Sequence, residues 1–201
     1  VYAFLRWQDA RKIKWLILSA IFCGFAAGAK YLGLPIILAI FIILFVRLLF
    51  LEKAKSKHII SNLAIFILSA GLVGSVWYIK SWILTGNPTF PFFFGGRNWN
   101  DLSGQLLTEN LRNYGMGKGL ISFFLGPWNI AFHGHSFDMG EMLGVLYLSF
   151  LPILVFFWKD NRIIRNISIY SILYYLFWFF LSQQAKFLLP IMPFLAVIAA
   201  Y

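Results

Sequence analysis

The sequence predicts an all-α fold of the polytopic membrane class: a helical bundle of about six transmembrane helices, with one long outer-face segment that bears short interfacial helices. Three observations predict this class. The chain is 61% hydrophobic and 12% charged with a mean hydropathy of +0.78, whereas soluble domains are roughly 45–50% apolar and about 25% charged. Its apolar residues gather in runs close to the length of a spanning helix. Its Lys and Arg residues cluster in the short gaps between runs, as in cytoplasmic loops.

The apolar runs are the predicted membrane segments of one membrane-embedded domain, 1–201. They cover about 15–29, 33–51, 59–79, 142–158, 166–182 and 187–201. A spanning helix needs roughly 20 residues, with about 17 as the lower limit. The first, fourth and fifth runs are therefore expected to tilt or to insert in part.

Small residues spaced by four positions predict close packing between these helices. They are Gly24 and Gly28, Gly71 and Ser75, and Ala70 and Gly74. Such spacing lets helix backbones approach each other in lipid, where no hydrophobic force draws helices together.

The basic clusters predict the orientation of the helices. The clusters are Arg11, Lys12 and Lys14; Lys53, Lys55 and Lys57; and Lys159, Arg162 and Arg165. With all three inside, the outer face carries Lys30–Tyr31, the segment 80–141 and residues 183–186. The clusters also explain the formal charge of +10 as solvated loops, so no nucleic-acid partner is expected.

The segment 80–141 is longer than the roughly 12–15 residues of an ordinary loop, and it is too apolar to be disordered. Leucines at helical spacing predict a helix over 102–111, and a second apolar stretch covers 120–128. We expect both to lie on the membrane surface, apolar side down. The glycines of GMGKG, residues 115–119, are expected to break the chain between them, because the motif lacks the spacing of a phosphate-binding loop.

Metal and disulfide chemistry have little support in the residues. Cys23 is the single cysteine, so no internal disulfide forms. His133 and His135 lie near Asp138 and Glu141 without a further ligand cluster at a recognised spacing. We therefore expect no cofactor and assign no metal ligand, although a divalent metal is not excluded.

Four cations are predicted on the outer face: Lys30, Lys80, Arg97 and Lys186. One interpretation is that each lysine extends to the interface and keeps its ammonium in water. The other is that the four converge on an anionic group such as a lipid-linked phosphate. This second interpretation explains cations on the face that the positive-inside rule leaves poor in them.

The stretch GNPTFPFFFGGRNW, residues 86–99, has features of a binding surface. Asn87-Pro88 signals a turn, and Gly95 and Gly96 permit a positive φ and close backbone approach. Arg97 is suited to gripping a phosphate bidentately, and Trp99 to stacking on a sugar. The alternative is that the whole stretch is an interfacial aromatic belt.

Four motifs carry a resemblance to a known family. They are GFAAGAKYLGLP (24–35), WYIKSWILTGNPTFPF (77–92), FGGRNW (94–99) and QQAKFLLPIMP (183–193). In this order they resemble bacterial polytopic glycosyltransferases of the GT-C superfamily, relatives of protein mannosyltransferases and of lipid A aminoarabinose transferase. The resemblance covers nearly the whole chain.

The resemblance implies an enzyme of the bacterial inner (plasma) membrane that transfers a sugar from a polyprenyl-phosphate donor to a lipid, glycan or protein acceptor at the outer face. On this hypothesis the four cations face the donor phosphate. The residues expected to line the sugar or acceptor region are Tyr31, Asn87, Trp99 and Gln183. Lys186 stands where family members often have Arg, which keeps the charge and loses the bidentate geometry.

The catalytic base is not assigned to this chain. In the family the key acidic residue follows the first membrane helix, which corresponds to a position before Val1. We therefore expect an internal piece of a longer protein, inactive as it stands, and assign no base. The remaining carboxylates of the outer segment are Asp101, Glu109, Asp138 and Glu141.

Two other functions stay open. An O-antigen ligase or polymerase also combines many helices with a large outer loop, and its loop is expected to be richer in Arg and His. A lipid or sugar transporter places polar residues near the bilayer midplane, whereas the predicted helix centres here are almost free of charge.

Overall fold

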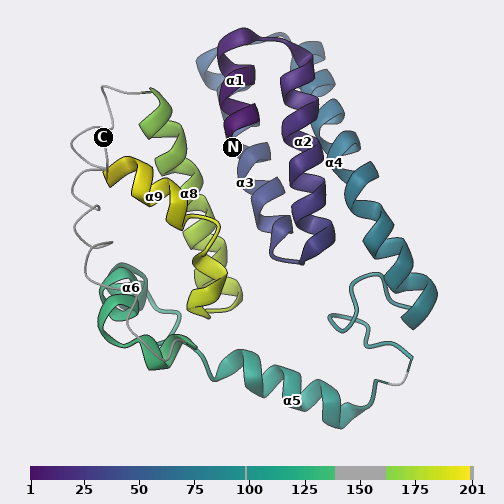
Figure 1. Ribbon diagram of the computed structural model, residues 1–201, viewed down its shortest axis with the longest axis vertical. Coiled ribbons are helices and arrows are strands. Elements are labelled where there is room, and N and C mark those ends of the chain that lie inside the picture. The colour runs from purple at the N-terminus through teal and green to yellow at the C-terminus, as the bar shows by residue number, and fades with distance from the viewer. Residues whose placement is uncertain (98, 139–161, 200–201) are drawn as a thin grey trace. The chain divides into compact units, whose positions relative to one another are not determined.

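The computed structural model describes residues 1–97, 99–138 and 162–199, and these form helices joined by loops (Figure 1). The prediction of an all-α fold is confirmed for this part of the chain, in which no β-strand occurs. The predicted span 142–158, Glu141 and the last two residues of the predicted sixth run lie outside the described residues. The chain divides into two compact units, Val1–Gly104 and Gln105–Tyr201. Because each unit is described by itself, the prediction of a single domain stays a prediction.

The first unit consists of helices that pack around α2 (Figure 1). They are α1 (Tyr2–Ala10), α2 (Ile13–Ala29), α3 (Gly33–Val46), the π-helical turn η1 (Arg47–Leu51) and α4 (Ser56–Thr85). Helix α2 contacts α1, α3 and α4. A further helix, α5 (Asp101–Arg112), begins at the end of this unit and continues into the second.

The close contact between α2 and α4 is made by the predicted small residues. A Cβ added to Gly24 would lie 2.5 Å from the carbonyl oxygen of Ala70, and one added to Gly74 would lie 3.3 Å from the carbonyl oxygen of Gly24. By contrast, Gly71 has no such neighbour within 4 Å. The spacing therefore predicted the right kind of contact, and the structure selects Ala70 and Gly74 over the Gly71 register.

The connection between α2 and α3 is a tight turn. The N–H of Gly33 donates to the carbonyl of Lys30 at 2.8 Å, and that of Leu34 donates to the carbonyl of Tyr31 at 3.0 Å. A Cβ on Gly33 would lie 2.2 Å from the carbonyl carbon of Ala26. Only glycine therefore lets α3 begin this close to α2.

A carboxylate between two arginines joins the ends of helices at the predicted inner side of the first unit. Glu52 accepts a hydrogen bond from Arg11, and its Oε1 also accepts from Nε of Arg47 at 2.7 Å. The Arg11 guanidinium in addition lies 5.0 Å from the centre of the Trp7 ring of α1. Helix α1 itself was not predicted from the sequence, because it is too short and too polar to form an apolar run.

The second unit holds the shorter elements and one long helix (Figure 1). They are α6 (Leu120–Phe132), the 3₁₀ turn η2 (Gly134–Phe137), α8 (Arg162–Leu181), the 3₁₀ turn η3 (Ala185–Leu188) and α9 (Met192–Ala199). Helix α8 contacts η3 and α9, and α6 contacts η2. The predicted helix 102–111 corresponds to α5, and the predicted break at the glycines separates it from α6.

Three helices among the described residues are long and apolar enough to cross a membrane, which indicates a membrane protein. They are α3 continued by η1 (Gly33–Leu51), α4 and α8. The helices α2 and α6 are apolar but shorter. Helix α4 extends beyond the predicted 59–79 at both ends, so Lys80 lies within the helix and not at its end. The sixth run, predicted to start near 187, instead begins with the turn η3 and becomes α-helical only at Met192.

Candidate functional site

The residues that follow α4 form an ordered loop, 86–97, which we call the aromatic loop. Its organiser is Asn87, whose side chain is 1% exposed. The Nδ2 of Asn87 donates to the carbonyls of Phe92 at 2.9 Å and Gly95 at 2.6 Å. The Oδ1 accepts from the backbone N–H of Thr89 at 2.9 Å and from its hydroxyl at 3.0 Å. Both donors and both acceptor positions of this amide are thus used inside the loop.

The predicted site residue Tyr31 connects this loop to the turn between α2 and α3. Its hydroxyl donates to the carbonyl of Phe90 at 2.5 Å. Its ring meets Phe92 edge-to-face, with ring centres 5.2 Å apart. Tyr31 and Asn87, predicted to line the same region, are therefore brought together by the loop, and both serve its internal structure.

The other end of the loop is closed against Trp99. The Phe90 and Trp99 rings meet edge-to-face at 5.3 Å. The N–H of Arg97 donates to the carbonyl of Thr85 at 2.7 Å, which returns the chain to the end of α4. Gly96 has a φ of 156°, and a Cβ there would lie 2.6 Å from Cδ2 of Phe90. The paired glycines thus allow the close backbone approach that the sequence predicted.

Three of the predicted cations belong to the first unit, and all three are exposed. Lys30 follows directly after α2. Lys80 lies on α4 with its Nζ 5.2 Å from the centre of the Trp77 ring. Arg97 ends the aromatic loop, where its backbone is fixed by Thr85. They come from three different elements of one unit.

The fourth predicted cation, Lys186, lies in η3 of the second unit. It forms an ion pair with Asp138, in which the side chains are 51% and 29% exposed. Asp138 has a φ of 59°, a left-handed conformation that Asp tolerates better than most residues. The sequence did not predict this ion pair, because the two residues lie far apart in the chain and no local pattern links them.

The predicted site residue Gln183 organises a second turn, residues 113–119, which we call the glycine turn. Its Oε1 accepts from the N–H of Met116 at 3.1 Å, and its Nε2 donates to the carbonyl of Gly117 at 2.8 Å. Gly115 and Gly117 have φ of 100° and 91°. Gln183 is 2% exposed, so it holds the turn from inside.

A pocket of about 310 Å³ lies against this turn. Its lining residues are Thr108, Leu111, Tyr114, Gly115, Gly117, Lys118, Leu181 and Gln183. The Lys118 ammonium donates to the carbonyl of Phe180 at 2.8 Å, near the end of α8. A cation at a helix C-terminus is favoured there by the helix dipole and by the unpaired carbonyls. The sequence analysis did not select Lys118 as a site residue, although a lysine between two glycines was a signal that could have found it.

Metal ligands do not gather in the described part of the chain, where no group of three His, Cys, Asp or Glu side chains is placed to hold an ion. His133 and His135 are exposed, and their proposed neighbour Glu141 lies outside the described residues.

Comparison with known proteins gives one relative and no function. No protein-family model matches the chain, and no solved structure matches it. Among curated proteins, it is similar to an uncharacterized protein of Shigella flexneri, with 27% identity over 143 residues, which is 70% of this chain and 70% of that protein. Because that relative is described only as uncharacterized, the similarity brings no activity to this chain.

Proposed function

We propose that the chain is part of an integral membrane glycosyltransferase of the GT-C type, which transfers a sugar from a polyprenyl-phosphate donor to a lipid, glycan or protein acceptor. The proposed protein crosses a bacterial inner membrane about six times, with the segment 80–141 on the outer face. The similarity to a bacterial protein is compatible with this location.

The observation that carries the proposal is the build of the aromatic loop. A buried amide, Asn87, fixes the loop from inside, while Arg97 stays exposed at its end. The hydrogen-bonded loop fixes the backbone of Arg97 before a ligand arrives, which reduces the backbone entropy lost on binding. The family motifs TGNPTFPF and FGGRNW fall on this loop.

The proposed chemistry divides between cations and a base. The acceptor hydroxyl attacks the anomeric carbon, the bond from that carbon to the phosphate oxygen breaks, and polyprenyl phosphate leaves. Cations stabilise the charge that develops on the leaving phosphate, and a carboxylate takes the hydroxyl proton. Lys30, Lys80 and Arg97 of the first unit are the proposed cations, Lys186 of the second unit is a further candidate from the sequence, and no base is assigned within this chain.

Asn87 and Gln183 are positioning residues, each within its own unit. Asn87 is buried and bonds the backbone of the aromatic loop, and Gln183 is buried and bonds that of the glycine turn, so neither offers a polar atom outward. Tyr31 likewise positions the loop through its hydroxyl. Trp99 is the proposed sugar-facing member, because its ring is partly exposed beside Phe90.

The test is a transfer assay with the full-length natural protein in lipid vesicles, using radiolabelled polyprenyl-phosphate sugars across a donor panel. We expect label to reach an acceptor with at least one donor. Arg97→Ala is expected to lower kcat/KM by about 10²-fold, the effect of removing one stabilising donor. Lys57→Ala, an exposed cation on the predicted inner side, is the matched control and should leave transfer unchanged. Absence of transfer with every donor and acceptor would overturn the proposal.

The ion pair needs a test of its own. If Lys186 acts on the donor, Lys186→Ala lowers transfer and a second change, Asp138→Asn, does not restore it. If Lys186 only neutralises Asp138, the double variant recovers activity, because the unpaired carboxylate is gone.

A further inference from the structure

The four phenylalanines of the aromatic loop divide into two pairs with opposite environments. Phe90 and Phe92 face inward, against Trp99 and Tyr31 respectively. Phe93 and Phe94 face outward and are 88% and 82% exposed. Large aromatic side chains are rarely this exposed without a partner, since their burial is what stabilises them.

The outward pair is held there by the loop. Phe93 has a φ of 65°, the left-handed region that side chains with a Cβ disfavour. The carbonyl of Phe92, immediately before it, accepts from the buried Asn87 amide, and the carbonyl of Gly95, just after the pair, accepts from the same amide. Phe93 keeps this disfavoured conformation because the hydrogen bonds of Asn87 fix the loop on both sides of the pair. The outward direction of its side chain is therefore set by the fold of the loop.

The neighbouring surface indicates what covers the pair. Helix α4, a candidate membrane span, ends immediately before the loop, and near its end Trp82, Ile83 and Leu84 are 62%, 69% and 62% exposed. These residues continue the exposed apolar surface of the candidate span, the surface that meets lipid if α4 crosses a membrane. Lys80 and Trp82 are residue types that gather at the membrane–water interface. These residue types therefore predict that the loop starts at the level of the lipid headgroups.

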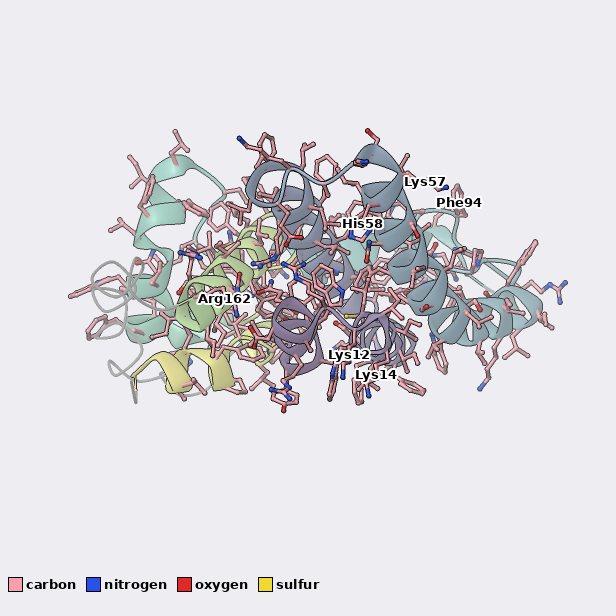
Figure 2. The ribbon with its side chains drawn as sticks, turned by 90° about the horizontal axis from the view of Figure 1, so that it is seen from above. Lys12, Lys14, Lys57, His58, Phe94 and Arg162 are labelled. Carbon is pink, nitrogen blue, oxygen red and sulfur yellow. The ribbon has the colours of Figure 1, made fainter. Side chains whose placement is uncertain are left out.

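We propose that Phe93 and Phe94 form a rigid tip that inserts into the lipid monolayer beside the end of α4. Its partner is a lipid surface, and the tip anchors the aromatic loop at a fixed depth. Phe94, labelled in Figure 2, is 82% exposed. This anchor does not depend on the proposed sugar transfer.

The test places an environment-sensitive fluorophore on Phe94→Cys in the full chain, reconstituted into phosphatidylethanolamine and phosphatidylglycerol vesicles. Cys23 is buried, at 4% exposure, and the chain without an added cysteine provides the labelling blank. Lys55→Cys, on an exposed residue before α4, is the water-facing control. We expect blue-shifted emission at position 94, severalfold weaker quenching by iodide than at position 55, and quenching by lipids that carry a nitroxide on the acyl chain.

A second variant tests whether the phenylalanine tip, and not the attached dye, causes the insertion into lipid. Phe93→Asp, combined with the label at position 94, adds a charge to the tip and should at least halve the quenching by nitroxide lipids. The proposal is overturned by water-like emission at position 94, or by no response to Phe93→Asp. It is also overturned by a blue shift that disappears on dilution of the protein in the bilayer, which would assign the tip to a second copy of the chain.

Discussion

The aromatic loop and the glycine turn are both irregular segments held by one buried side chain, but the hydrogen bonds that hold them differ in sequence range. In each, one buried side-chain amide bonds backbone groups of an irregular segment, Asn87 in the first and Gln183 in the second. Asn87 bonds residues of its own loop, from Thr89 to Gly95. Gln183 instead reaches from the end of α8 to Met116 and Gly117, distant in the sequence. The side-chain amide bonds of the aromatic loop are therefore local, with Tyr31 as a separate tie to the turn between α2 and α3, whereas those of the glycine turn depend on where α8 lies.

The strongest way to break the glycine turn is Gly115→Ala. A Cβ there would lie 1.7 Å from Oε1 of Gln183, and the φ of 100° is disfavoured for alanine as well. We expect a loss of about 2–4 kcal/mol, through strain and a displaced Gln183. Denaturation in detergent measures it, with Gly119→Ala as the control because no atom lies within 4 Å of a Cβ there. Equal stability of the two variants would contradict a close contact between Gly115 and Gln183.

Gln183→Ala removes the two hydrogen bonds by which Gln183 holds the glycine turn, which we call the clamp, and it adds no bulk. It leaves the N–H of Met116 and the carbonyl of Gly117 without their side-chain partner, at a cost of about 1–3 kcal/mol. Hydrogen exchange should quicken both in the glycine turn and at the end of α8, because the clamp joins the two. Gln105→Ala, on an exposed residue of α5, is the control. Faster exchange in only one of the two segments would show that they are not coupled.

Asn87→Ala tests whether the hydrogen bonds of Asn87 order the aromatic loop alone. The carbonyls of Phe92 and Gly95 lose their donor, and we expect a loss of about 1–2 kcal/mol, since parts of the loop regain water. Faster exchange should stay within 86–97 and leave α4 protected. Asn113→Ala, on an exposed residue, is the comparison. Spread of the effect into α2 or α3 would show that the loop's order is not local.

The smallest expected effect is that of Gly86→Ala. Gly86 ends α4 with a φ of 77°, and no atom lies within 4 Å of a Cβ placed there. Only the conformational preference is lost, about 1 kcal/mol. Thermal unfolding in detergent compares it with Gly115→Ala, and a loss as large as in that variant would mean that the aromatic loop is as tightly enclosed as the glycine turn.

The features predictable from the sequence are those set by local periodicity. The apolar runs 33–51 and 59–79 coincide with or fall within helices, and small residues at a spacing of four predicted close packing, although not the pairing of Gly24 with Ala70. Leucines at helical spacing likewise predicted α5. Each of these signals is contained in one stretch of chain, so no tertiary information was needed.

The features that could not be predicted depend on which side chain turns inward. The run of phenylalanines gives no periodic signal, so the separation of Phe92 from Phe93 follows only from the bonds of Asn87. The pairing of Lys186 with Asp138 arises from contact between distant segments. Asn87 and Gln183 were predicted to line a sugar or acceptor region, and this stays a prediction. The sequence could not show that both side chains bond backbone groups of irregular segments.

The short turn at Gly33 has a practical consequence for mapping membrane topology. With Gly33 against Ala26, the connection between α2 and α3 has no slack for an epitope tag or a reporter fusion. An insertion after Lys30 would separate the two helices and report on a disrupted protein. The glycine-free stretch 52–55, between η1 and α4, is the better insertion point, provided that Glu52 keeps its two arginines.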